Sequence, residues 1–301
     1  MTTERLSTCP LCGKRQIRPD SFATWQLNLA QDHAVTRCAR CGLRFLNPRP
    51  DPMAYEQMYR DGSGPLSETY PPSQEYYAHE DDVRLGEYRT KLDLLVEAGA
   101  RGRLLEIGAC TGVFLSEARR CGFEVEGIEP SEENRRRALE NHNLRLHPGV
   151  AEGQDFADAS FDVVFSSHVF EHLTDPAAVT RQAFRWLRPG GFLMIEVPNQ
   201  FESFASRRKR WLKTTRRKER SFLCVHHTVF FSRRTVTTLV KRAGFVPRRL
   251  RNIYYSSDSL WRHPLQAAGR LIGAAAGGSA VIEILAQKPV DPYAMGRNAT
   301  E

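Results

Sequence analysis

The sequence predicts an α/β protein whose main part is a doubly wound, mostly parallel sheet, with a small cysteine-rich module in front of it. From about residue 86 the hydrophobic pattern alternates between short apolar runs and segments of helical period, which is typical of such a sheet. Before it, a Cys-x-x-Cys-Gly motif occurs twice, and a proline-rich run over residues 47–52 interrupts regular structure. A chain of 301 residues accommodates about two domains. We therefore expect a module over residues 1–50, a linker or lid over residues 51–85 and the main domain over residues 86–301.

The composition is ordinary for a globular protein, since 41% of the residues are hydrophobic and 26% are charged. The net charge of +8 comes from one stretch, because residues 207–220 hold nine Lys or Arg and one acid. The rest of the chain is close to neutral, which disfavours nucleic acid as a partner. Residues 1–10 are polar and lack the apolar run of a secretory signal, so we expect a cytoplasmic protein.

Four cysteines in the first part of the chain predict a metal site. Cys9 and Cys12 form one pair, Cys38 and Cys41 form the other, and a glycine follows each pair. Four thiolates around one ion suit tetrahedral Zn²⁺, and a site filled by protein ligands is structural. Iron in the same ligand set and four unrelated reduced cysteines are the alternatives. We expect a structural zinc site in a module that resembles a zinc ribbon.

The elements of the main domain follow from hydrophobic period and from capping residues. A helix over residues 113–120 ends at Gly122, a second begins after Ser131 with two acids in its first turn, and a third begins after Asp175 with a proline first. We expect strands over residues 103–107, 123–128, 143–147, 161–166 and 192–197.

Ligands of such sheets bind at the carboxyl ends of the strands, so the residues at those ends are candidates for a binding site. Glu106 ends the first strand before a glycine-containing loop, and Glu129 ends the second, where a carboxylate can accept both hydroxyls of a ribose. The whole candidate set comprises Glu106, Gly108, Cys110, Gly112, Glu129, Pro130, Ala151, Glu152 and His168.

The loop and the acid at Glu129 would, taken alone, equally suit NAD. Two details disfavour a dinucleotide. Cys110 stands where the second glycine of the Gly-x-Gly-x-x-Gly pattern would be, and Glu106 would repel a pyrophosphate while suiting an ammonium group. A ligand made of adenosine and an amino acid accounts for both details.

Four stretches together resemble class I S-adenosylmethionine-dependent methyltransferases. Leu105–Gly112 is similar to the first motif of that superfamily, and Gly127–Ser131 is similar to the second. Ser160–Leu173 resembles the region of the fourth strand, and Leu187–Leu193, with its Pro-Gly-Gly, resembles the turn into the fifth. The resemblance implies a Rossmann-like sheet and S-adenosylmethionine as cofactor. Cys110 departs from the glycine usual at its position, and we interpret it as a packing residue.

The resemblance also implies that the sheet ends in an antiparallel hairpin. We expect its last strand over residues 280–286, paired with a strand near residues 249–255. Residues 265–286 are long enough to cross a bilayer, but they are interrupted by charges and glycines. We interpret them as a Gly/Ala helix followed by that strand.

Residues 9–52 resemble the zinc-binding module that precedes this domain in some bacterial methyltransferases of nucleotide-linked sugars and related intermediates. The sugar C-methyltransferases of that group carry a further C-terminal domain, for which this chain is too short. We therefore expect methyl transfer to a small anionic or carrier-linked biosynthetic intermediate, with a nucleotide-linked sugar as one option. A membrane-associated quinone or lipid-type O-methyltransferase and a non-catalytic cofactor-binding protein are the alternatives. The oligomeric state is left open.

Histidines are the candidate bases for the acceptor, because an imidazole titrates near neutral pH. Residues 225–232 resemble the stretch where related enzymes place histidines on the substrate side, so we favour His227 as the base and His226 as the alternate. His172 follows Glu171 just after the fourth strand of the expected sheet. In related quinone O-methyltransferases a similar Glu-His stretch is associated with a divalent metal; here it either faces the acceptor or orients the loop.

Two further segments have open interpretations. The aromatic-rich stretch over residues 53–77 either lines a pocket or is a surface linker with a short helix over residues 54–60. The basic run at 207–220, in an insertion over residues 203–222, is a clamp for a phosphorylated substrate, a dock for anionic lipid headgroups or a solvated loop. The second option would make the cytoplasmic protein peripheral to the membrane.

Overall fold

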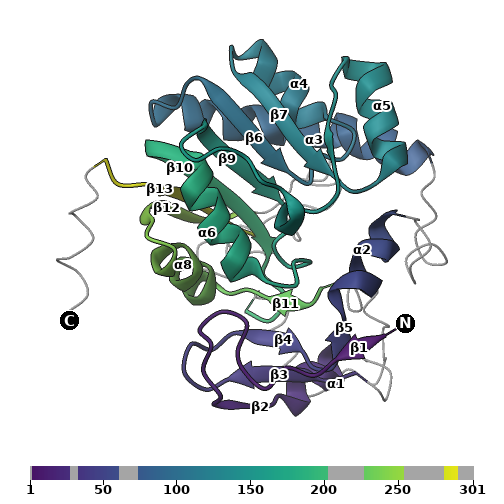
Figure 1. The fold of residues 1–301 in the computed structure, drawn as a ribbon, viewed down its shortest axis with the longest axis vertical. Coiled ribbons are helices and arrows are strands. Elements are labelled where there is room, and N and C mark those ends of the chain that lie inside the picture. The colour runs from purple at the N-terminus through teal and green to yellow at the C-terminus, as the bar shows by residue number, and fades with distance from the viewer. Residues whose placement is uncertain (1, 28–32, 61–73, 203–226, 254–280, 291–301) are drawn as a thin grey trace, which may run out of the picture.

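The computed structural model of the protein describes residues 2–27, 33–60, 74–202, 227–253 and 281–290 (Figure 1). These residues form a seven-stranded sheet covered by helices, with a smaller sheet packed against one end of it. The expected insertion at 203–222 and most of the expected Gly/Ala helix lie outside the described residues.

The large sheet has the order β12-β13-β10-β9-β6-β7-β8. Strand β13 runs antiparallel to both of its neighbours, while β10, β9, β6, β7 and β8 pair in parallel. This arrangement confirms the doubly wound, mostly parallel sheet and its antiparallel last pair of strands. The strands are β6 (Arg103–Ile107), β7 (Glu124–Glu129), β8 (His147–Pro148), β9 (Phe161–Ser167), β10 (Leu187–Pro198), β12 (Val246–Ile253) and β13 (Val281–Gln287).

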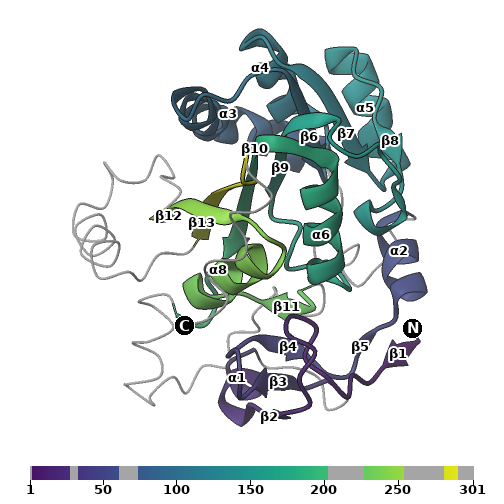
Figure 2. The ribbon, with the colours of Figure 1, turned by 60° about the vertical axis from the view of Figure 1, so that its left-hand side comes forward.

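Helices cover both faces of this sheet, as Figures 1 and 2 show from two directions. Apolar residues of α3, α4 and α5 pack on one face, and those of α6 and α8 pack on the other. Each helix buries one stripe because its apolar residues recur at helical period. The helices are α3 (Gln74–Glu97), α4 (Val113–Arg120), α5 (Glu132–His142), α6 (Pro176–Trp186) and α8 (Arg233–Arg242), with a short 3-10 helix η1 (Ala151–Gly153).

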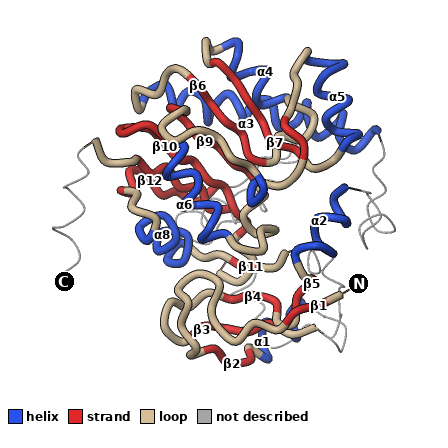
Figure 3. The backbone as a smooth tube through the Cα atoms, viewed as in Figure 1, coloured by secondary structure: helices blue, strands red, loops and turns tan. Residues whose placement is uncertain are grey.

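The predicted helix starts are confirmed by their hydrogen bonds. The Ser131 hydroxyl accepts from the backbone N–H of Asn134 at 3.3 Å, and a carboxylate oxygen of Asp175 accepts from that of Ala178 at 2.8 Å. Both side chains satisfy N–H groups that have no partner inside the helix. Figure 3 shows the resulting alternation of helix and strand along the chain.

The strand predicted over residues 143–147 is wrong in extent, because only His147 and Pro148 pair with β7. Asn143 has a left-handed backbone, with φ 51°, and the N–H of Leu144 donates to the carbonyl of Ala138. These two residues therefore terminate α5 and are unavailable to extend the strand.

A four-stranded sheet of order β11-β4-β3-β2 joins the N-terminal module to the main domain. The module supplies β2, β3 and β4, and the main domain supplies β11. Strand β11 (Val229–Phe230) pairs with β4, and the N–H of Leu46 donates to the carbonyl of Thr228 at 2.9 Å. The four cysteines share one apolar core cluster with residues of β9, β10 and α8. The module is thus packed into the main domain. Its elements are β1 (Thr3–Glu4), β2 (Ile17–Pro19), α1 (Ser21–Leu27), β3 (Val35–Cys38), β4 (Arg44–Leu46) and β5 (Arg49–Pro50).

The predicted linker contains helical structure on both sides of its undescribed part. Helix α2 (Pro52–Arg60) confirms the short helix expected near residues 54–60. Helix α3 runs through residue 86, so the boundary predicted there falls inside a continuous helix of 24 residues. The hydrophobic period that indicated residue 86 marks the part of α3 that is buried against the sheet, from Tyr88 onward.

Candidate functional site

The glycine-containing loop between β6 and α4 is packed tightly against its neighbours. The N–H groups of Gly108 and Ala109 both donate to the carbonyl of Ile128 at 2.9 Å, which ties the loop to β7. A Cβ atom on Gly108 would lie 2.3 Å from Cγ2 of Val169, and the φ of this glycine is +77°. The loop therefore touches both β7 and the segment that follows β9, which requires glycine at position 108.

Cys110 is accommodated at the position where related loops have glycine. Its backbone is left-handed, with φ 48°, and its N–H donates to Oε2 of Glu129 at 2.9 Å. The hydrogen bond to a buried carboxylate stabilises a conformation that is uncommon for a residue with a side chain. The departure from the usual motif thus leaves the loop connected to the end of β7.

Glu129 is buried at the end of β7 and accepts several hydrogen bonds. Its Oε1 accepts from the N–H of Ser131 at 2.9 Å and from the amide of Asn134 at 3.4 Å. Burial raises the pKa of Glu129, although the N–H donors from Ser131 and Cys110 oppose that effect. Its predicted neighbour Pro130 follows directly, and the Pro130 carbonyl accepts from Arg135 at 2.7 Å.

Glu106 is the buried carboxylate at the end of β6, with a relative exposure of 4%. Among the described residues, its Oε2 has no hydrogen-bond partner. Burial raises the pKa of Glu106 well above its usual range, while the nearby cation of Arg84 lowers it in part. A buried carboxylate oxygen of this kind fits the ammonium group of an amino-acid ligand, as the sequence predicts.

The other predicted cofactor residues lie at the same edge of the sheet. Ala151 is buried in η1, and Glu152 beside it accepts from the hydroxyl of Thr174 at 3.3 Å. His168 follows β9 with a left-handed backbone, φ 56°, and its N–H donates to the carbonyl of Glu196 at 3.1 Å. The structure brings these residues to the carboxyl ends of the strands, and their contact with a cofactor stays a prediction.

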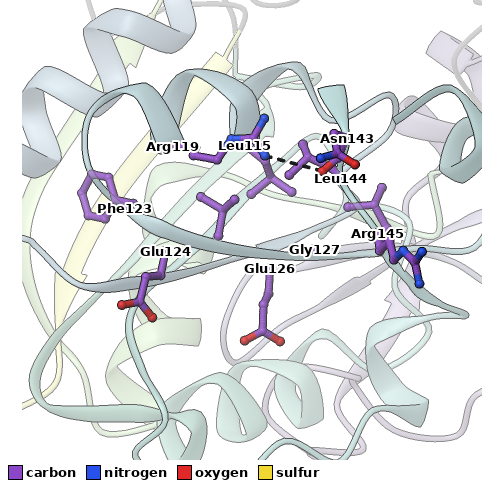
Figure 4. Close-up of a pocket in the computed structure, with 11 residues that line it drawn as sticks. Leu115, Arg119, Phe123, Glu124, Glu126, Gly127, Asn143, Leu144 and Arg145 are labelled. Carbon is purple, nitrogen blue, oxygen red and sulfur yellow. Dashed lines mark hydrogen bonds between the residues drawn. The ribbon is translucent and has the colours of Figure 1, made fainter. Parts of the chain in front are cut away.

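A cavity of about 560 Å³ lies away from this edge, beside the first half of β7 (Figure 4). It is lined by Leu115 and Arg119 of α4, by residues 123–127 and by residues 143–146. None of the predicted site residues lines it. Its acids are Glu124 and Glu126, which lie in the first half of β7 and not at the carboxyl end of a strand.

A second group of polar residues surrounds the buried carboxylate of Glu171, four residues after β9. Its Oε1 lies 3.4 Å from Nδ1 of His168, 3.8 Å from Nε2 of His172 and 4.0 Å from Nε2 of His227. Burial alone would raise the pKa of Glu171, but the neighbouring imidazoles of His168, His172 and His227 lower it to about 2. Glu171 is therefore an ionised carboxylate ringed by three histidines. We call Glu171, His168, His172 and His227 the histidine cluster.

Backbone hydrogen bonds join the two segments that carry this cluster. The N–H of Thr228 donates to the carbonyl of Glu171 at 2.9 Å, and its hydroxyl donates to the carbonyl of Leu173 at 2.9 Å. The rings of His172 and His227 meet edge to face with their centroids 4.7 Å apart. The structure thus brings together His172 and His227, which the sequence predicts as separate candidates, whereas His226 lies outside the described residues.

The cluster also has a donor set that a metal ion could use. Ligand atoms of Glu171, His172 and His227 lie within 4.8 Å of one another. Two imidazoles and one carboxylate are a common set for divalent transition metals. The arrangement is consistent with either a base oriented by a carboxylate or a metal site.

The four predicted zinc ligands converge in the N-terminal module. Sγ of Cys9 lies 3.5 Å from Sγ of Cys41, and Sγ of Cys12 lies 3.7 Å from Sγ of Cys38. Zinc at about 2.3 Å from four tetrahedral sulfurs places those sulfurs about 3.8 Å apart, so the spacing fits zinc closely. All four side chains are buried.

The electrostatics of the thiols also suit a cation. The hydrogen bond from Cys9 lowers the pKa of Cys41 to about 5. The pKa of Cys9 is raised by the same hydrogen bond and by burial, although N–H groups of Cys12 and Leu11 point at its sulfur and lower it in part. The cluster therefore holds a thiolate even without metal, and a metal would replace the remaining protons.

Several residues near the two sites were not predicted from the sequence. The hydroxyl of Tyr55 lies 3.1 Å from Nδ1 of His172, and Nη2 of Arg84 donates to the hydroxyl of Ser167 at 3.0 Å. Lys91 and Glu196 form a buried ion pair at 3.3 Å. The sequence contains a pattern that could have indicated Arg84 and Lys91, because both lie at helical spacing from the buried Tyr88. Tyr55 belongs to the aromatic-rich stretch over residues 53–77 that the sequence offers as a pocket lining, but its contact with His172 joins residues 117 positions apart.

Among the described residues, no helix combines the length and the apolar character needed to cross a bilayer.

Comparison with known proteins agrees with this architecture. The ubiquinone biosynthesis O-methyltransferase of Caulobacter sp. strain K31 is 36% identical over 106 residues, which are 33% of this chain and 41% of that relative. The same enzyme of Xanthomonas oryzae pv. oryzae strain PXO99A is 36% identical over 126 residues, or 39% of this chain and 50% of that relative. The chain thus spans about half or less of the length of these curated relatives.

A solved structure and a family of domains complete the comparison. An S-adenosylmethionine-dependent methyltransferase of Thermotoga maritima superposes with a TM-score of 0.51 at 22% identity, covering 74% of this chain and 98% of that one. At this identity the likeness shows the fold. A family described as a methyltransferase domain matches residues 77–250, which is more than half of the chain. The chain therefore belongs to the methyltransferase domain family and has the class I fold of its S-adenosylmethionine-dependent members.

Proposed function

We propose that this chain transfers a methyl group from S-adenosylmethionine to a small anionic or carrier-linked biosynthetic intermediate, with a nucleotide-linked sugar as the first acceptor to test. The observation that carries the proposal is the histidine cluster, placed just after β9 beside the glycine-containing loop. Val169 connects the two sites, because it touches Gly108 and lies two residues before Glu171. A methyl donor in the loop would thus have a base close by.

The cofactor residues support S-adenosylmethionine over a dinucleotide. Glu106 offers a buried oxygen to the ammonium group, and Glu129 lies where it can accept hydrogen bonds from ribose hydroxyls. Carboxylates accept up to four hydrogen bonds, so the three donors already on Glu129 leave one acceptor position for a ribose hydroxyl. A pyrophosphate next to Glu106 would meet a second negative charge.

In the proposed reaction the acceptor attacks the methyl carbon in line with the sulfur. The carbon–sulfur bond breaks, its electron pair stays on sulfur, and S-adenosylhomocysteine leaves. The proton of the acceptor passes to His227, and the ionised Glu171 stabilises the imidazolium that forms. No covalent intermediate with the protein is needed.

The acceptor class is supported by features of the chain other than the cluster. The basic run at 207–220 lies in sequence between β10 and His227, and it would suit a phosphorylated or diphosphate-linked group. The zinc-type module resembles that of enzymes acting on nucleotide-linked sugars. We also propose that the four cysteines hold a structural Zn²⁺.

The second candidate is an O-methyltransferase of a quinone precursor, and it rests on the names of the relatives. Those relatives match 106 to 130 residues of this chain at 29–36% identity, which is too short a match to carry an acceptor over to it. The metal-competent donor set in the histidine cluster also fits this candidate.

An acceptor screen tests both candidates. The purified chain is incubated with S-adenosylmethionine and, in parallel, with nucleotide-linked sugars, carrier-linked acids and a polyprenyl catechol in anionic vesicles, and S-adenosylhomocysteine is measured. We expect turnover with an anionic soluble acceptor. Turnover with the catechol alone would select the second candidate, and cofactor binding without any turnover would indicate a non-catalytic binding protein.

The role of His227 is tested on the acceptor so identified. His227→Asn is expected to lower kcat about 100-fold or more while leaving the affinity for S-adenosylmethionine unchanged. His142→Asn, at the end of α5, is the matched control and should keep full activity. Equal kcat values for the two variants would exclude His227 as the base.

A further inference from the structure

A tyrosine of the segment after the N-terminal module reaches the histidine cluster. Tyr55 lies in the middle of α2 and is 5% exposed, and its hydroxyl is 3.1 Å from Nδ1 of His172. The other ring nitrogen of His172, Nε2, faces Oε1 of Glu171 at 3.8 Å. His172 thus lies between a phenol on one side and a carboxylate on the other.

This placement favours one tautomer of His172. Oε1 of Glu171 lies 3.8 Å from Nε2 of His172, and a carboxylate oxygen attracts a proton on that nitrogen, whereas it would repel a lone pair there. In the neutral ring a proton on Nε2 leaves a lone pair on Nδ1. The hydroxyl of Tyr55 is then the donor and Nδ1 the acceptor of the 3.1 Å hydrogen bond.

We infer that Tyr55 is a positioning residue of the methyl-acceptor site, whose hydroxyl holds His172 in the Nε2–H tautomer and keeps its ring against His227. The inference rests on the proposed function, because it assigns Tyr55 to the site in which His227 is the base. The position of the His172 ring affects His227 through their edge-to-face contact. The two ring centroids are 4.7 Å apart, and the ring planes meet at 83°.

The module holds α2 in place for this contact. A guanidinium nitrogen of Arg49 donates to the carbonyl of Thr174 at 2.6 Å, and Arg49 also pairs with Glu4 at 2.8 Å. Two residues further on, Asp51 caps α2 by accepting from the N–H of Ala54 at 2.8 Å. The N-terminal module is therefore fixed to the loop that carries Glu171 and His172.

The competing interpretation is that Tyr55 only fills space beneath α2. Tyr55→Phe separates the two, because it keeps the buried ring and removes the hydroxyl. Thr24→Val is the matched control within the module. The Thr24 hydroxyl accepts from the N–H of Val35 at 2.9 Å and donates to the carbonyl of Asp20 at 3.0 Å, so its loss weakens the module without touching the cluster.

The first readout is the ¹⁵N chemical shifts of the histidine side chains in the full-length, metal-containing protein at pH 8. His172→Gln identifies the signal of His172 by its disappearance. We expect the Nε2–H tautomer for His172 in the unmodified protein and in Thr24→Val, and a shifted Nδ1 signal in Tyr55→Phe. A proton on Nδ1 in the unmodified protein, or an unchanged signal in Tyr55→Phe, overturns the inference.

The second readout is methyl transfer to the acceptor found in the screen. Tyr55→Phe is expected to lower kcat about tenfold with unchanged affinity for S-adenosylmethionine, which is typical of losing a residue that orients a functional histidine. Thr24→Val should keep kcat. A shifted Nδ1 signal with unchanged kcat overturns the positioning role. Full activity in His227→Asn would instead contradict the proposed function. The ¹⁵N shifts of His172 in Tyr55→Phe do not depend on activity, so they test the role of Tyr55 separately.

Discussion

At the scale of residues, two buried carboxylates, one in β6 and one in the segment after β9, have opposite electrostatic environments. Glu106 has a raised pKa because burial dominates, whereas Glu171 has a lowered pKa because three imidazoles surround it. Glu106 is therefore suited to a cation that arrives with a ligand, and Glu171 to cationic partners within the protein. This difference is the one we expect between an acid that binds the cofactor and an acid that supports proton transfer.

The first prediction concerns Glu106 and pH. A carboxyl whose pKa is raised on folding stabilises the protein below its unfolded pKa, and this contribution is lost as pH rises through the folded pKa. Glu106→Gln removes that loss, so we expect it to raise the free energy of unfolding of the cofactor-free protein at pH 8 by about 1 kcal/mol or more. Thermal unfolding at pH 5 and pH 8 measures this.

The same substitution should weaken cofactor binding. S-adenosylmethionine would be bound with release of the proton from Glu106, so its affinity should increase with pH in the unmodified protein and lose that dependence in Glu106→Gln. Calorimetry in buffers of different ionisation enthalpy measures the released proton. A substitution that leaves both stability and affinity unchanged would show that Glu106 does not face the cofactor.

The second prediction concerns Gly108. Gly108→Ala places a methyl group 2.3 Å from Val169 and keeps a φ of +77°, so both steric overlap and backbone strain oppose it. We expect a loss of about 2 kcal/mol in the free energy of unfolding and a weaker affinity for S-adenosylmethionine.

Gly122→Ala is the control for this prediction, because Gly122 has a similar φ of +89° and no atom within 4 Å of an added Cβ. It should show only the backbone strain, about 1 kcal/mol. Adding Val169→Ala to Gly108→Ala should restore part of the lost stability. Equal effects of the two glycine substitutions would mean that the contact with Val169 is unimportant.

At the scale of elements, the N-terminal module and the main domain are joined by strand pairing and by a common core. Strand β11 begins two residues after His227 and pairs with β4 of the module. Because the cysteines pack in the same cluster as β9, β10 and α8, loss of the metal should affect the main domain as well.

The third prediction tests this coupling. The purified protein is expected to contain about one zinc per chain, and Cys38→Ser should lose the metal together with several degrees of thermal stability. Cys121→Ser is the control, since Cys121 is exposed and outside the cluster, and it should keep both. Mass spectrometry measures the metal content of each variant, and thermal unfolding measures its stability. Zinc-free, fully stable wild-type protein would refute the structural site, and about two metals per chain would indicate that the histidine cluster is also occupied.

At the scale of the whole molecule, local signals predicted most of the main domain. The strands β6 and β9, the caps Ser131 and Asp175 and the four cysteines follow from hydrophobic period, side-chain capping and motif spacing, which depend on near neighbours in sequence. The antiparallel pairing of β12 with β13 came from the family resemblance. These features also placed Glu106 and Glu129 at one edge of the sheet.

What the sequence did not predict depends on contacts between distant residues. The pairing of β11 with β4 joins residues more than 180 positions apart, as Val229 faces Phe45, and Tyr55 meets His172 across 117 positions. The short β8 reflects a competition in which the end of α5 uses Asn143 and Leu144. The sequence predicts His172 and His227 as separate candidates, and the contacts that bring them together around Glu171 are of this long-range kind.

The most direct test of the central claim is calorimetry of the purified chain with S-adenosylmethionine and, separately, with NAD. The account predicts saturable binding of S-adenosylmethionine to one site per chain, none of NAD, and at least a tenfold weaker affinity for S-adenosylmethionine in Glu129→Ala. Absence of S-adenosylmethionine binding, preference for NAD, or unchanged affinity in Glu129→Ala would contradict it.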